Sequence, residues 1–197
     1  MTRLILASSN RGKLAELADL LAPCGYELIA QSDHGVGDAE ETGATFIENA
    51  IIKARHATRA TGLPALADDS GLVVDALDGE PGLRSARYAG RHGDDAANNA
   101  LLLQRLRDVP DTARSAHFYC VLVMLRHAQD PQPLIAEGAW HGRILHAARG
   151  VNGFGYDPLF QPDGHAVSSA ELDPAMKNAI SHRGQALAAL RERLSRD

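Results

Sequence analysis

The stretch LILASSNRGKLAELADLL, residues 4–21, decides the fold class. It opens with a short apolar run, passes through a polar turn, and continues with leucines and alanines spaced three and four residues apart. The run is typical of a buried strand, and the spacing is typical of an amphipathic helix. The sequence therefore predicts a strand over residues 3–8 and a helix over 11–22, as at the start of an α/β protein.

The rest of the chain extends this strand and helix pattern. Strands and helices alternate at the N-terminal end, whereas the middle is mostly strand, which favours an α/β fold with a mixed sheet. The expected strands cover 26–31, 63–67, 72–74, 116–126, 134–140 and 142–146. The expected helices run from a cap at Thr42 or Thr45 to about 61, over 94–107, and, after the segment 170–180, from about 181 to 196.

Composition narrows the class of protein. The chain has 197 residues, 45% of them hydrophobic and 23% charged, which is ordinary for one globular domain spanning 1–197. No apolar stretch is long enough to cross a bilayer and no signal segment opens the chain, so we expect a cytoplasmic protein without membrane partners. The net charge of −5 argues against nucleic-acid binding. Two distant cysteines and nine scattered histidines offer no disulfide framework or zinc pattern.

The polar turn SSNRGK, residues 8–13, resembles a phosphate-binding loop only in part. A P-loop needs an earlier glycine and a hydroxyl after the lysine, and here Leu14 follows Lys13. The free N–H groups and the dipole of a helix start would still favour a bound phosphate. The alternative is that Ser9 or Asn10 only caps the helix.

Two pairs of carboxylates are candidates for metal chemistry. Asp68 and Asp69 end an apolar strand in this interpretation, and neighbouring strand residues point to opposite faces, so the two should have different roles. Glu40 and Glu41 precede a helix, where the dipole alone can account for them. The functional alternative is Mg²⁺, which takes one or two carboxylates and leaves room for substrate phosphates.

Three further features have both structural and functional interpretations. Lys53 is either a solvated helical lysine or a cation that reaches a cleft. The segment GFGYDP, 153–158, is either a turn with a buried aromatic or a site where Phe154 stacks on a flat ligand and Asp157 accepts a hydrogen bond. In KNAISHRG, 177–184, Ser181 is an expected helix cap, and Arg183 opposes the dipole unless an anion or carbonyl lies there.

Six motifs in order resemble the inosine/xanthosine triphosphate pyrophosphatase family. They are S-x-N-x-G-K, E-E-T-G-x-T-F-x-E-N-A-x-x-K-A, A-D-D-S-G-L, P-G-x-x-S-A-R-Y-A-G, F-G-Y-D-P and K-x-x-I-S-H-R-G-x-A. The resemblance spans nearly the whole chain. It implies a homodimeric, Mg²⁺-dependent enzyme that splits deaminated purine triphosphates (ITP, dITP and XTP) into monophosphate and pyrophosphate. It also implies an elongated mixed sheet flanked by helices, which form two lobes around a central substrate cleft.

The same resemblance implies roles for individual residues. Asp69 is the expected general base, and Glu41 and Asp69 are the expected metal ligands, with Glu40 and Asp68 as alternatives. The implied substrate contacts are Ser8, Ser9, Asn10, Arg11, Gly12, Lys13, Lys53, Ser70, Phe154, Gly155, Tyr156, Asp157, Lys177, His182 and Arg183. Within this set, Phe154–Asp157 are expected to recognise the base, and His182 and Arg183 to read the purine. Two other functions remain open: a nucleotide sensor without catalysis, and a hydrolase of modified pyrimidine triphosphates.

Overall fold

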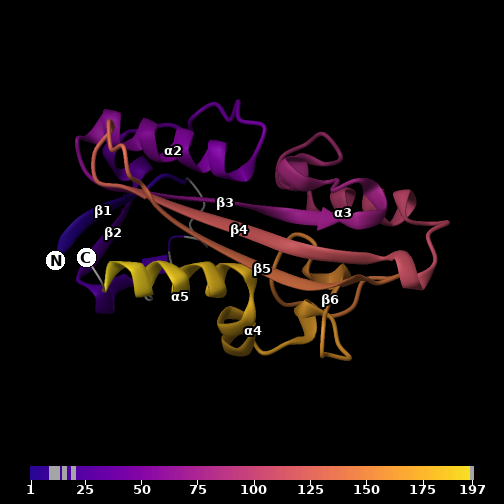
Figure 1. Cartoon of the computed structure of the whole chain (residues 1–197). Helices are drawn as coiled ribbons and strands as arrows, with labels where there is room; N and C mark the ends of the chain where they lie inside the picture. The colour runs from indigo at the N-terminus through magenta and orange to yellow at the C-terminus, as the bar shows by residue number, and fades with distance from the viewer. Residues whose placement is uncertain (9–13, 15–16, 19–20, 196–197) are drawn as a thin grey trace. The chain divides into compact units, whose positions relative to one another are not determined.

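The computed structural model describes residues 1–8, 14, 17–18 and 21–195. The strands are β1 (Thr2–Leu6), β2 (Tyr26–Ala30), β3 (Ala65–Val74), β4 (Ser115–Leu125), β5 (Leu134–Ile144) and β6 (Phe160–Pro162). The α-helices are α2 (Phe46–Thr61), α3 (Asp95–Arg105), α4 (Pro174–Ile180) and α5 (His182–Leu194), labelled as in Figure 1. Residues 14, 17, 18 and 21 are also helical, as predicted.

The strands hydrogen-bond in the order β2-β1-β3-β4-β5-β6. Both β2 and β3 run parallel to β1, while β6 runs antiparallel to β5. The predicted α/β class with a mixed sheet is therefore confirmed. Among the described residues, no helix is both long and apolar enough to cross a bilayer.

The chain divides into two compact units, which are described separately. Unit 1 comprises Met1–Asp69, Cys120–Gly138 and Gln185–Asp197, and unit 2 comprises Ser70–Tyr119 and Ala139–Gly184. Strands β3, β4 and β5 each contribute residues to both units. The substrate cleft between two lobes stays a prediction.

In unit 1, helices cover both faces of the sheet. Leu4, Ile5 and Leu6 of β1 are fully buried, as expected for a parallel strand covered on both sides. One face packs Leu4, Leu6 and Leu66 against Leu187 and Leu190 of α5. The other face meets α2 (Figure 1). The alanines of α2 at 50, 54 and 57 are fully buried. Side chains therefore alternate between the α5 face and the α2 face along each strand.

Unit 2 is built on an aromatic core. The ring centroids of Phe118 on β4 and Phe160 on β6 are 4.7 Å apart, in an edge-to-face arrangement. Trp140 of β5 packs beside both rings. Leu102 of α3 and Leu72 of β3 complete this core. The core fixes α3 and the segment leading to β6, which carry part of the candidate site.

Two element predictions were wrong in the same way. Residues 63–67 and 72–74 were expected to form two strands, but β3 is continuous and includes Asp68 and Asp69. Residues 134–140 and 142–146 were likewise expected as two strands, and β5 is one. The carboxylates therefore lie within a strand rather than at its end. Each aspartate has a hydrogen-bond partner, Cys120 for Asp68 and Lys53 for Asp69, that offsets the cost of its burial.

Candidate functional site

Three of the predicted residues meet in unit 1. The ammonium of Lys53 lies 2.7 Å from Oδ1 of Asp69 and 2.9 Å from Oε1 of Glu41. These side chains come from α2, from β3 and from the segment before α2, and the side chains of Lys53 and Asp69 are only 13% and 12% exposed. The neighbouring Glu40 is exposed. Two carboxylates therefore converge on a single cationic centre.

Local structure explains why Glu41 lies beside α2. Thr45 caps the helix by accepting from the N–H of Glu48, whose carboxylate accepts from the N–H of Thr45 in return. The N–H of Gly43 donates to Oδ1 of the buried Asn49 at 2.8 Å. A Cβ at Gly43 would come within 2.6 Å of Cβ of Glu48, so only glycine allows this close approach. The segment with Glu41 is thereby folded back on the start of the helix.

The two aspartates of β3 have different partners, while the prediction that their roles differ stays a prediction. Asp69 points to the α2 face and binds Lys53. Asp68 is 1% exposed and accepts a hydrogen bond from the thiol of Cys120 at 3.2 Å, in the core on the α5 face. Neighbouring side chains of a strand point to opposite faces of the sheet, and the two aspartates therefore meet different partners.

The charge of Lys53 is stabilised where it lies. Burial disfavours the ammonium, but the carboxylates of Asp69 and Glu41 outweigh burial and raise the pKa of Lys53 above its ordinary value. Lys53 is therefore a permanent cation at neutral pH, held between two acceptors.

The donor set fits a Mg²⁺ ion. Glu41 and Asp69 offer carboxylate oxygens that already converge on a cation, which is the ligand chemistry that Mg²⁺ requires. Within the described part of the chain, no group of three or more His, Cys, Asp or Glu side chains gathers for a metal. A pair of carboxylates is sufficient for Mg²⁺, because substrate phosphates and water complete its shell.

Unit 2 brings together a second set of predicted residues. The carboxylate of Asp157, 4% exposed, accepts from Nζ of Lys177 at 2.5 Å and from the N–H of Phe154 at 2.8 Å. The ammonium of Lys177 also lies 5.4 Å from the centroid of the Phe154 ring, within cation–π range. The ring itself is 53% exposed. Gly153 has a φ of +77°, and a Cβ there would clash with Asp157.

The start of α5 carries the predicted purine-reading pair. His182 stacks on Phe118 with centroids 4.9 Å apart, and Arg183 donates to Oγ of Ser70 at 3.2 Å. Both side chains are buried. Ser181 accepts from the N–H of Gly184, which confirms it as the helix cap. Stacking on Phe118 and the hydrogen bond to Ser70 thus help to position these two side chains.

The predicted phosphate turn is described only at Ser8. Ser8 is half-buried and lies two residues beyond β1. Ser9, Asn10, Arg11, Gly12 and Lys13 lie outside the described residues. Their roles stay predictions.

Sequence reasoning missed several residues that support the site. Ser169 donates to the carboxylate of Asp157 at 2.8 Å. Asp95 and Asn99 of α3 bind the backbone of Gly155. The only sequence signal for the latter pair is the four-residue spacing that places both on one face of a helix.

The chain is similar to known proteins along nearly its full length. The model of the Ham1 family matches residues 4–193. A dITP/XTP pyrophosphatase of Xanthomonas campestris is 58% identical over 194 residues, covering 98% of each chain. Another, from Vibrio cholerae, is 56% identical over 187 residues, covering 95% of this chain and 94% of the relative. A HAM1 protein structure from Coxiella burnetii superposes with a TM-score of 0.95 at 51% identity, covering both chains fully.

Proposed function

The chain belongs to the Ham1 family of nucleotide pyrophosphatases, and on that premise we propose that it hydrolyses dITP, XTP and ITP to the monophosphate and pyrophosphate with Mg²⁺. The name that the close relatives share supports this choice of substrate. The observation that carries the mechanism is the convergence of Glu41 and Asp69 on Lys53. In the cell, such an enzyme would remove deaminated purines from the nucleotide pool.

The proposed reaction is attack of water on the α-phosphorus. Glu41 and Asp69 would hold Mg²⁺, which would supply Lewis acidity and neutralise phosphate charge. Asp69 accepts the proton of the attacking water, and the bond from the α-phosphorus to the bridging oxygen breaks as pyrophosphate leaves. Lys53 and Lys13 balance the charge of the leaving group. General-base assistance accounts for about 10²- to 10⁴-fold, so positioning and charge must supply the rest.

Hydrogen bonding supports a preference for 6-oxo purines. Hypoxanthine and xanthine present an acceptor where adenine presents an amino donor, and His182 and Arg183 carry donors. An unpaired donor facing adenine would cost about 1–3 kcal/mol. Guanine also has a 6-oxo group, so its exclusion would need a clash or an unpaired group at the 2-amino side.

The decisive experiment incubates the purified chain with Mg²⁺ and ITP, dITP, XTP, GTP, ATP and modified pyrimidine triphosphates, and identifies the products. We expect IMP, dIMP and XMP with pyrophosphate, and little turnover of ATP. Release of orthophosphate with the diphosphate would refute attack at the α-phosphorus. Tight binding without turnover would instead make the protein a nucleotide sensor, and turnover confined to pyrimidines would make it a different hydrolase.

A pair of adjacent variants tests the metal site. Glu41→Gln should raise the Mg²⁺ concentration for half-maximal activity at least about tenfold, since even the outer-shell partners of metal ligands are worth that much. Glu40→Gln is the matched control, because Glu40 is exposed and should leave the Mg²⁺ requirement unchanged. The reverse outcome would assign the ligand to Glu40.

We also propose that the chain forms a homodimer, as its family resemblance implies. Light scattering of the purified protein would measure twice the chain mass of 21.0 kDa. A mass of one chain at working concentration would refute the dimer.

A further inference from the structure

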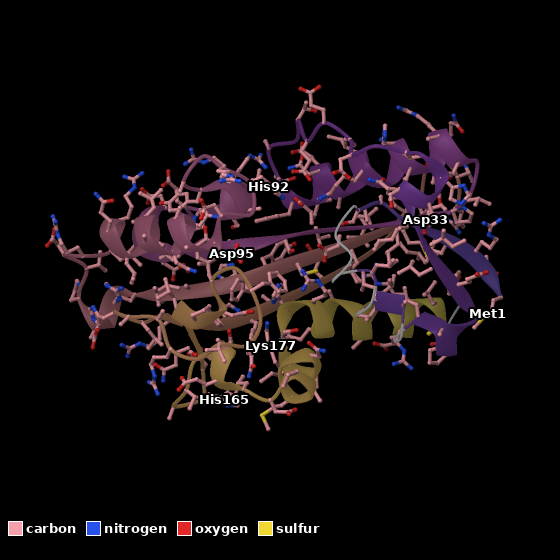
Figure 2. The ribbon with its side chains drawn as sticks, turned by 180° about the vertical axis from the view of Figure 1, so that it is seen from behind. Met1, Asp33, His92, Asp95, His165 and Lys177 are labelled. Atoms are coloured by element: carbon pink, nitrogen blue, oxygen red, sulfur yellow. The ribbon has the colours of Figure 1, made fainter. Side chains whose placement is uncertain are left out.

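Helix α3 holds the segment 153–157 by its backbone. Oδ2 of Asp95 accepts from the N–H of Gly155 at 2.7 Å, and Nδ2 of Asn99 donates to the carbonyl of Gly155 at 2.8 Å. The two side chains are four residues apart and therefore lie on the same face of the helix. Figure 2 labels Asp95 at the start of α3 and Lys177 on α4, and the segment contacts both.

Other contacts also fix the same segment. The hydroxyl of Tyr156 donates to the carbonyl of Ser85 at 2.8 Å, and its ring is buried. The carboxylate of Asp157 binds Lys177 and Ser169. Each residue from 155 to 157 is thus tied to another part of unit 2, while Phe154, which precedes them, exposes its ring.

This network occupies three backbone donors of the segment 153–157. The N–H of Phe154 donates to Asp157, that of Gly155 to Asp95, and that of Asp157 to the carbonyl of Phe154. A 6-oxo group is an acceptor, so to pair with any of these three N–H groups it would have to displace the bond that the group already makes. The feature that the segment presents outward is the aromatic ring, and every purine has a π-face to stack on it.

We propose that Asp95 and Asn99 are positioning residues that hold Phe154 as a stacking platform, and that this platform binds purines without choosing among them. The inference rests on the proposed function, which supplies the purine. In this proposal α3 contributes to the affinity for the substrate, whereas the choice among purine bases depends on other residues.

The test replaces the two α3 side chains and compares affinity with selectivity. Asp95→Ala and Asn99→Ala should each raise KM for ITP and for GTP by the same factor, about three- to tenfold, because the loop must then be ordered on binding. The value of kcat should stay unchanged. Hydrogen exchange of the amides in 153–157 should become faster. Gln104→Ala, an exposed site on the same helix, is the control and should change none of these quantities.

A conservative variant separates positioning from general damage. Asp95→Asn keeps an oxygen that accepts from Gly155, so it should restore the slow exchange and the low KM. Unchanged exchange in the alanine variants, or an altered ratio of ITP to GTP affinity, would overturn the proposal. Dissociation constants for both nucleotides in EDTA give the same comparison without turnover, so absence of hydrolysis by the unmodified chain would refute the proposed function and leave this test intact.

Discussion

Asp69→Asn is expected to reduce kcat for ITP by about 10²- to 10⁴-fold, the usual range for loss of a general base. The substitution preserves volume, and the amide oxygen can still accept from Lys53, which also keeps Glu41 as a partner. The fold and nucleotide binding should therefore persist. Steady-state kinetics with ITP, together with a dissociation constant for ITP in EDTA, measure the two quantities separately.

A control variant tests whether the loss of one negative charge is by itself enough to change the kinetics. Asp108→Asn neutralises an aspartate whose side chain is 86% exposed and pairs at the surface with Arg107. It should leave kcat and KM unchanged. If Asp69→Asn retained near-normal kcat, Asp69 would not be the base, and another group would have to accept the proton.

Arg114→Met is expected to lower the melting temperature by roughly 10 °C, the shift that about 3–5 kcal/mol produces in a chain of this size. The guanidinium is 1% exposed and donates to the carbonyls of Leu106, Val109, Ile144 and Leu145 at 2.7 to 3.3 Å. Burial lowers the pKa of Arg114 from its ordinary value, yet an arginine stays charged at neutral pH. Methionine fills similar space but removes the donors that Arg114 supplies, at about 1–3 kcal/mol for each carbonyl left unsatisfied.

Calorimetry of the purified variants measures this loss. Arg107→Met is the matched control, because the Arg107 side chain is 77% exposed and its pair with Asp108 is worth little. Its melting temperature should stay close to that of the unmodified chain. Equal melting temperatures for the two variants would show that the four carbonyls find water or new partners when the guanidinium is gone.

Local signals predicted most helices and strands correctly. The spacing of alanines and the threonine before them placed α2, and the structure chose Thr45 over Thr42 because Glu48 completes the capping box. The errors in strand boundaries came at residues that have poor strand propensity but fit their surroundings in the folded sheet. Asp68 and Asp69 were expected to interrupt β3, and Gly142 was placed at the start of a separate strand. A Cβ at 142 would clash with the backbone of β6, a short strand that the sequence did not predict.

The candidate site shows the same difference between what the sequence indicated and what the packing decided. Family motifs named Glu41, Lys53 and Asp69 but said nothing of a direct contact among them. Only the packing of α2 against the sheet brings the three within ion-pair distance. The segment Phe154–Asp157 was expected to recognise the base, and this stays a prediction. The structure adds that the carboxylate of Asp157 accepts from Lys177, Ser169 and the N–H of Phe154.

The sequence by itself determined the α/β class, the main helices with their caps, and the residues that resemble a pyrophosphatase site. These depend on spacing within a few residues, where backbone geometry decides which side chains share a face. The tertiary structure alone decided which charges pair and how α3 binds Gly155, 56 and 60 residues further along the chain. Contacts between such distant residues depend on how whole elements pack, and no local pattern records that packing.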